Sequence, residues 1–268
     1  MIINHNISSM NALRNLSVNS DSMSKTMEKL SSGYRINRAA DDAAGLAISE
    51  KMRAQISGLN QAQRNAQDGI SLIQTAEGAL NEVHSMLRRM RDLSLQASTG
   101  TNQADDIEKI QSEVGQLIAE ISGIAGRTEF NGMNLLNAAA DVSFQIGSNS
   151  NQVISVGLLD MTATTGLSIN GVDVTTDPQG AIDTLDGAIS AVSSFRSTLG
   201  SVQNRLEHTI KNLATTEENL QASESRIRDA DMAAQMADLT KNQILQQAGT
   251  AMLAQANTKS QSVLSLLG

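Results

Sequence analysis

Histidine and cysteine are the side chains best suited to proton transfer, nucleophilic attack and metal binding near neutral pH. The three histidines, His5, His84 and His208, are too far apart for a local metal-binding motif. Neither His84 nor His208 opens the His-Glu-x-x-His pattern of helical zinc proteases. Cysteine is absent, which excludes disulfides and cysteine-ligated metals. The sequence therefore predicts no metal site.

Carboxylates are the next candidates for acid–base chemistry, and they are plentiful but scattered along the chain. Carboxylates spread over helix faces are usually solvated rather than catalytic. No glycine-rich phosphate loop and no nucleophile elbow accompanies them. We therefore predict that the protein is not an enzyme, has no catalytic residues and needs no cofactor.

Charge and hydropathy narrow the possible partners further. The net charge of −8 and the pI near 4.9 argue against nucleic acid, since neutralising phosphates requires concentrated lysine and arginine. No run of 18 apolar residues is present, so we expect neither a membrane span nor a translocator that inserts into host membranes. The first seven residues lack the basic and apolar regions of a signal peptide.

The composition and the spacing of apolar residues predict a chain made mainly of long helices. Apolar residues make up 40% of the chain, aromatic residues only 1%, and there is a single proline, so few positions stop a helix. Spacings of three and four predict helices over 3–30, 42–97, 107–124 and 182–227. The second would be about 84 Å long at 1.5 Å per residue, and the third should pack antiparallel against it.

Capping residues and turn residues set the limits of these elements. Gly33 should end the first helix, Asp41 or Asp42 should cap the second, and Asp177 with Pro178 should begin the fourth. Alternating apolar residues predict one β-hairpin over 142–156. The segment 161–176 is interpreted as a loop or a second, weak hairpin.

The two chain ends carry apolar stripes on otherwise polar, weakly charged helices. Such helices are marginally stable in isolation, so we expect the two to pair with each other. We also expect them to stay mobile in a monomer and to fold on assembly. The predicted seam consists of Ile3, Ile7, Met10, Leu13, Leu16, Met23, Met27, Leu30, Leu245, Met252, Ala256, Val263, Leu264 and Leu267.

Several motifs resemble those of bacterial flagellins over nearly the whole chain. The most specific is KLSSGYRINRAADDAAGLAI at 29–48, followed by RTEFNG at 127–132, SRIRDADM at 225–232 and AMLAQAN at 251–257. A hook–filament junction protein, which has similar terminal helices, is the rival interpretation, but the continuous middle motifs favour a short flagellin without outer variable domains.

The resemblance implies a mainly α fold, a long antiparallel helical bundle with one small β-hairpin region and terminal helices paired as an inner coiled coil. Residues 1–41 would form the N-terminal inner-core helix and its connection, 42–176 and 177–228 the two parts of the rod domain, and 229–268 the C-terminal inner-core helix. It also implies a helical homopolymer, the extracellular flagellar filament of swimming bacteria.

The resemblance further implies partners. They are the flagellar type III export apparatus, an export chaperone that reads Leu264, Leu266 and Leu267, cap and junction proteins, and a host flagellin receptor. By motif, the receptor and neighbouring protofilaments would contact Arg89, Leu93 and Glu113, although Arg88, Arg89 and Arg91 are otherwise interpreted as a solvated basic face.

A second group of charged residues, near the ends of the inner-core helices, is predicted to form ion pairs that set register more than strength. These residues are Arg35, Arg38, Asp41, Asp42, Arg226, Arg228, Asp229 and Asp231.

Overall fold

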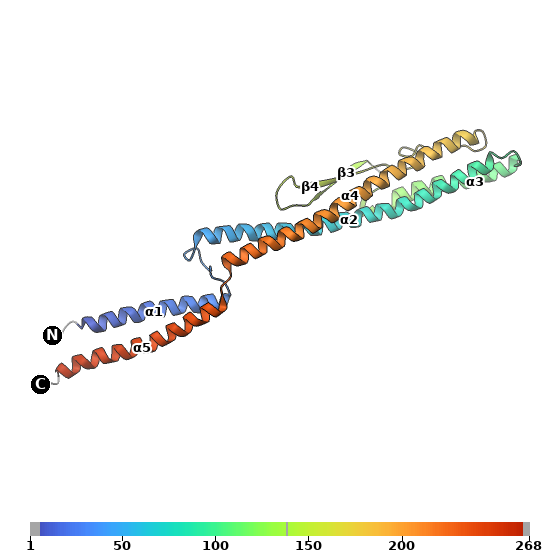
Figure 1. Ribbon diagram of the computed structural model, residues 1–268. Coiled ribbons are helices and arrows are strands. Elements are labelled where there is room, and N and C mark those ends of the chain that lie inside the picture. The colour runs from blue at the N-terminus through green and yellow to red at the C-terminus, as the bar shows by residue number, and fades with distance from the viewer. Residues whose placement is uncertain (1–5, 138, 265–268) are drawn as a thin grey trace. The chain divides into compact units, whose positions relative to one another are not determined.

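The computed structural model describes residues 6–137 and 139–264. In these residues the chain forms long helices and two small antiparallel hairpins (Figure 1). The elements, in chain order, are α1 (Ile7–Ser32), α2 (Ala43–Ala97), α3 (Ala104–Arg127), β1 (Glu129–Phe130), β2 (Met133–Asn134), β3 (Ala140–Gln145), β4 (Val153–Leu158), α4 (Pro178–Arg228) and α5 (Met232–Leu264).

The chain divides into two compact units. One comprises residues up to 55 together with residues from 218 onward, and the other comprises 56–217. Both boundaries fall inside helices, since α2 and α4 each contribute to both units. No helix in the described part of the chain is long and apolar enough to cross a membrane.

The predicted helix ends are confirmed. Gly33 leaves α1 in the left-handed conformation, with φ of 74°, and its N–H donates to Lys29 O at 2.9 Å. The N–H of Gly45 donates to Asp42 Oδ1 at 2.8 Å, which makes Asp42 the cap of α2. At α4, Asp177 Oδ1 accepts from the N–H of Gly180 at 2.9 Å, and Pro178 is the first helical residue.

The larger unit has one continuous apolar core formed by α2, α3, α4 and the segment between α3 and α4. Helix α2 contributes a heptad row of fully buried residues, Ile73, Leu80 and Leu87. Met90, three residues after Leu87, is also fully buried. Arg89 near the end of α2 pairs with Glu113 near the start of α3, which confirms the predicted antiparallel packing. Leucine, isoleucine, valine and alanine make up most of this core.

The predicted β-hairpin is confirmed as β3 and β4, with Val142 opposite Val156 and Phe144 opposite Ile154. Strand β4 alternates exposed and buried residues, so Ile154, Val156 and Leu158 face the core. The segment 161–176 contains no strand and is therefore a loop, not a second hairpin.

A two-residue hairpin, β1–β2, was not predicted. Asn131 and Gly132 occupy its turn with φ of 52° and 75°, as a type I′ turn requires. The Asn-Gly pair was the available sequence signal.

In the smaller unit, α1 and α5 lie side by side and antiparallel (Figure 1). Asn6 Nδ2 donates to Ala256 O at 3.0 Å, and Asn19 Nδ2 donates to Asn242 O at 2.7 Å. The expected pairing of the two terminal helices is therefore present within one chain.

Candidate functional site

The contact between α1 and α5 follows a heptad spacing, but small and polar residues form much of it. The half-buried or buried positions on α1 that follow this spacing are Ser9, Ala12, Leu16, Asn19, Met23, Thr26 and Leu30, and Ser20, Glu28 and Lys29 are also half-buried. Those on α5 are Gln235, Leu239, Asn242, Gln246, Gly249, Leu253 and Ala256. Steps of three and four along both helices are typical of a coiled-coil seam.

Close approach of the two backbones explains why this face, and not the apolar stripe of α5, lies inward. A side chain added at Gly249 would lie 3.3 Å from Leu16 Cδ1, so this layer has little room to spare. Small residues let two helices come near enough for asparagine amides to reach main-chain carbonyls on the partner helix. Ser9 Oγ adds a hydrogen bond of 3.0 Å to Asn257 Oδ1.

The predicted seam residues divide between two faces. Leu16, Met23, Leu30 and Ala256 lie at the contact between α1 and α5. Those that remain exposed are Ile7, Met10, Leu13, Met27, Leu245 and Met252. These six are not buried between α1 and α5 of one chain, so their burial in an assembly seam stays a prediction. Ile3 and Leu267 lie outside the described residues, and Val263 and Leu264 are described only as part of helix α5.

Large apolar side chains therefore point away from the helix pair. Met252 is 66% exposed, Ile7 64% and Ile244 60%. Single exposed apolar residues are ordinary, whereas larger groups of them are typical of interaction surfaces. We refer to Ile7, Met10, Leu13, Val18, Met27, Met232, Met236, Ile244, Leu245 and Met252 as the outer apolar face.

The predicted receptor patch is only partly on the surface. Arg89 donates to Glu113 Oε1 from Nε at 2.9 Å and from Nη2 at 2.8 Å, and both side chains are about half exposed. Leu93, in contrast, is 2% exposed and belongs to the core, so it is not available to a partner in this structure. The leucine occupies a heptad position of α2 that faces inward, which the motif alone did not reveal.

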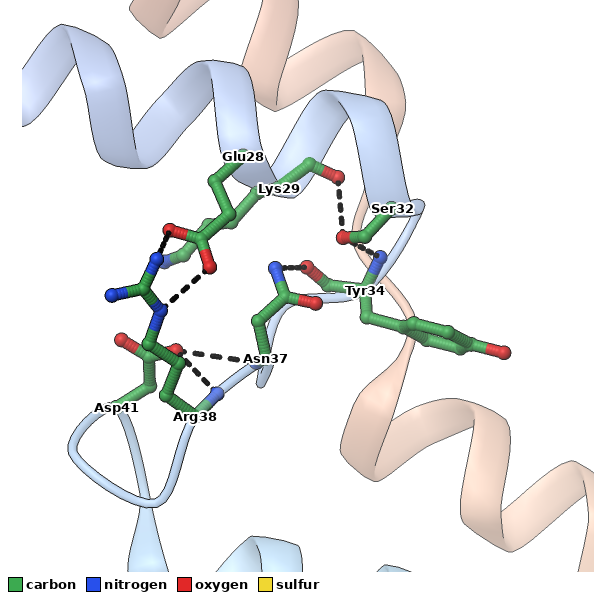
Figure 2. Close-up of polar contacts among 7 residues, drawn as sticks. All are labelled: Glu28, Lys29, Ser32, Tyr34, Asn37, Arg38 and Asp41. Atoms are coloured by element: carbon green, nitrogen blue, oxygen red, sulfur yellow. Dashed lines mark hydrogen bonds and ion pairs between the residues drawn. The ribbon is translucent and has the colours of Figure 1, made fainter.

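The connection from α1 to α2 is held by local polar contacts (Figure 2). Arg38 donates to Glu28 from Nε at 2.8 Å and from Nη2 at 3.0 Å. Asp41 Oδ2 accepts from the main-chain N–H groups of Asn37 and Arg38, and these bonds lower the pKa of Asp41 below its ordinary value. The contacts fold the loop back onto the end of α1.

The predicted ion pairs among the eight charged residues are not those that form. Arg38 pairs with Glu28, and Arg228 Nη1 pairs with Glu50 Oε1 at 2.6 Å. Aspartates are short, so Asp42 and Asp231 cap helices instead. Arg35 donates to the main-chain oxygen of Ile227, and Arg226 to Ser223 Oγ. Sequence reasoning missed Glu28 and Glu50, whose longer side chains reach the arginines.

Arg228 has the most buried guanidinium of these contacts. Its side chain is 12% exposed, and its guanidinium carbon lies 4.7 Å from the centre of the Tyr34 ring. The hydrogen bond from Arg228 is the main cause of a lowered pKa at Glu50.

Within residues 6–137 and 139–264, no group of three or more histidine, aspartate or glutamate side chains could hold a metal ion.

Long helices, a pair of terminal helices and exposed apolar side chains are typical of a structural protein. Two family profiles match, the bacterial flagellin N-terminal helical region at residues 3–141 and the bacterial flagellin C-terminal helical region at 182–267. The chain belongs to the bacterial flagellin family. It is a structural subunit of the flagellar filament, forms a homopolymer and is not an enzyme.

Full-length relatives agree with this assignment. The chain is 57% identical over 271 residues to a flagellin of Halalkalibacterium halodurans and 53% identical over 303 residues to a flagellin of Bacillus subtilis. It is 52% identical over 285 residues to the flagellar filament 33 kDa core protein of Treponema phagedenis. Each alignment covers all of both chains. No outer variable domain is present, so this is a short flagellin.

Solved structures show the same fold. The crystal structure of Bacillus cereus flagellin matches with a TM-score of 0.50 and 36% identity, covering 56% of this chain and 88% of that one. A putative flagellar hook-associated protein from Vibrio parahaemolyticus matches with a TM-score of 0.61 and 12% identity, covering 70% of this chain and all of that one. The second likeness concerns the fold alone.

Proposed function

We propose that the subunit polymerises by burying the outer apolar face of α1 and α5 against other copies of the chain. The observation that carries this proposal is the set of large apolar side chains that the α1–α5 pair leaves exposed. Burying one such side chain contributes roughly 1.5–3 kcal/mol, so a few per subunit interface favour assembly strongly. In this scheme residues 1–41 and 229–268 form the inner core of the filament, and 42–228 form the outer rod.

Polar substitution of exposed positions tests this assembly surface. Met10→Gln with Leu13→Gln should leave the monomer's helix content unchanged and raise the critical concentration for salt-seeded polymerisation by about tenfold or more, by loss of apolar burial. The matched control, Asn15→Gln with Ser17→Gln, changes exposed polar residues of the same helix. Sedimentation and negative-stain microscopy measure polymer. Normal filaments from the first variant would contradict the proposal.

The chain's C-terminal end is the second part of this surface. We expect deletion of residues 262–268 to leave a folded middle region and to abolish filaments, since the deletion shortens α5 and removes Val263, Leu264 and Leu267. We also propose that an export chaperone binds Leu264, Leu266 and Leu267. Circular dichroism and electron microscopy measure the two effects separately.

We further propose that the chain is exported unfolded through the flagellar type III apparatus and reaches the cell exterior. The absence of cysteine and the single proline support threading, because neither disulfides nor slow prolyl isomerisation at many sites restrict the chain. Inactivating the export ATPase should retain the subunit inside cells. Continued secretion in that strain would argue for another route. Cap and junction proteins would contact the same polymer.

A second candidate role, as ligand of an innate flagellin receptor, is favoured by the exposed Arg89–Glu113 pair. An exposed ion pair on a rod offers a charged contact at low cost in desolvation. Arg89→Ala should reduce receptor signalling by monomer at least tenfold, whereas Arg88→Ala, at the adjacent exposed position, should not. Equal signalling by both variants would refute the role. Leu93 would support this surface from below, and the same surface would contact a neighbouring protofilament.

A further inference from the structure

The two connections at the base of the α1–α5 pair are themselves paired. Tyr34 and Asp229 form an antiparallel bridge, in which Arg35 N donates to Arg228 O at 2.6 Å and Ala230 N donates to Gly33 O at 2.9 Å. Gly33 makes this possible, because its φ of 74° turns the chain directly from α1 into the bridge. The bridge thus lies immediately after α1 and immediately before α5.

Side chains reinforce the bridge. The Arg228 guanidinium lies over the Tyr34 ring at 4.7 Å and donates from Nη1 to Glu50 at 2.6 Å. Arg35 Nη2 donates to Ile227 O at 2.5 Å. A desolvated guanidinium over an aromatic face is more strongly held than an exposed one, and the Arg228 side chain is only 12% exposed. The bridge is therefore fixed by both main chain and side chains.

The helix pair specifies its own register weakly. Ser9, Ala12, Gly249 and Ala256, at the end of the seam far from the bridge, are small, so few large side chains interlock with the facing helix there. The asparagine amides of α1 donate to main-chain carbonyls, and every residue of α5 carries such a carbonyl. A displacement by one heptad would keep the two inner stripes face to face.

We propose that Tyr34 and Arg228 form a latch that fixes the register of α1 against α5. The latch ties the last turn of α1 to the first turn of α5, so it selects one register among those that the seam tolerates. A one-heptad displacement would shift one helix by about 10.5 Å and would break up the outer apolar face. This role rests on the proposed function, since register matters for assembly only if that face is buried between copies.

Disulfide trapping measures the register directly, because the chain contains no cysteine of its own. The Leu16–Gly249 contact places Ala12, four residues earlier, opposite Leu253, four residues later. Ala12→Cys with Leu253→Cys therefore reports the observed register. Ala12→Cys with Gln246→Cys reports the register displaced by one heptad.

Each reporter pair is introduced into four sequence backgrounds, and the soluble monomer of each is oxidised. In the wild-type and Tyr34→Phe backgrounds, which keep the ring, we expect the observed-register disulfide to dominate. In Tyr34→Ala with Arg228→Ala, the displaced disulfide should rise at least fivefold. Arg226→Ala, at an exposed position two residues from Arg228, should behave as wild type. Tyr34 is the only tyrosine of a chain without tryptophan, so its fluorescence should also change in Arg228→Ala.

Two results would overturn the latch. One is a displaced disulfide that stays at the wild-type level in the double alanine variant while circular dichroism shows intact helices. The other is equal formation of both disulfides in the wild-type background. If the double variant loses helix, Tyr34→Leu alone replaces it, since leucine keeps apolar bulk and leaves Arg228 paired with Glu50. Polymerisation of the cysteine-free chain is measured separately, so failure of the proposed function would not be mistaken for failure of the latch.

Discussion

At the scale of single residues, the polar side chains of this flagellin mainly satisfy the backbone at helix ends and loops. Asp42, Asp177 and Asp231 each accept main-chain N–H groups at the start of a helix. Asp173 does the same in the loop before α4, where it accepts from Thr175 and Thr176. Carboxylates held in this way are structural, and their ionisation is coupled to the local fold.

Asp173 gives a pH prediction at this scale. Hydrogen bonds, chiefly from the Thr175 hydroxyl, lower its pKa from 3.8 to about 2. A lowered pKa means that the stability contributed is complete above pH 3.8 and is lost as pH falls towards 2. Carboxyl carbon NMR should show a midpoint near 2, and Thr175→Val should move it upward. Thr165→Val, in the same segment, should leave it unchanged; no shift in Thr175→Val would contradict the assignment.

At the scale of elements, α1 and α5 differ from the helices of the larger unit in what they pack. The rod helices bury leucine, isoleucine and valine completely, whereas the α1–α5 seam combines partly buried leucine and methionine with small and polar residues. The small residues of the seam bring the backbones close, and many large apolar residues of both helices remain exposed. The helix pair therefore gains little from its own core and has most to gain from other copies.

Gly249 tests the importance of close approach. Gly249→Leu should separate the helices, because even a Cβ at this position would already lie 3.3 Å from Leu16. We expect lower protection of α1 and α5 from hydrogen exchange and slower polymerisation. Thr250→Leu, at the adjacent exposed position, is the matched control. If both variants exchange alike, the seam does not depend on this contact.

At the scale of the whole molecule, burial is distributed very unevenly between the two units. The continuous apolar core extends from Ala66 to Leu206 in sequence and belongs to the larger unit. In the described residues of the smaller unit, those that are fully buried are few, and Ile36 is the one large apolar side chain among them. Because apolar burial dominates stability, the two units should differ in their resistance to unfolding.

Native-state hydrogen exchange should reveal this difference. Amides of α1 and α5 in monomer should exchange at least a hundredfold faster than those of α2 and α4 within 66–206, and the difference should shrink in filaments. Leu199→Ala, at a fully buried position, should lower the stability of the larger unit by about 2–5 kcal/mol. Leu95→Ala, at an exposed position of α2, is its control. Uniform exchange along the monomer would contradict the prediction.

The sequence alone determined the long helices, the β3–β4 hairpin and the family. Helix limits at Gly33, Asp42 and Pro178 follow from local rules, since a left-handed glycine, a capping carboxylate and a proline act within one turn. The long three-four periodicity fixed the helices between them, and continuous motifs fixed the family. These signals need no knowledge of what lies across a contact.

Only the tertiary structure decided which faces meet. Leu93 proved to be buried, and the apolar residues Met252 and Leu245 proved to face outward, because a helix can present either of two stripes to its neighbour. Arg38 and Arg228 form ion pairs with Glu28 and Glu50 and not with nearby aspartates, because an ion pair depends on which carboxylate lies within reach of the guanidinium in the folded chain. Periodicity predicts that a helix has an apolar face. Which face packs against the neighbouring helix depends on the backbone separation and on the side chains of that neighbour.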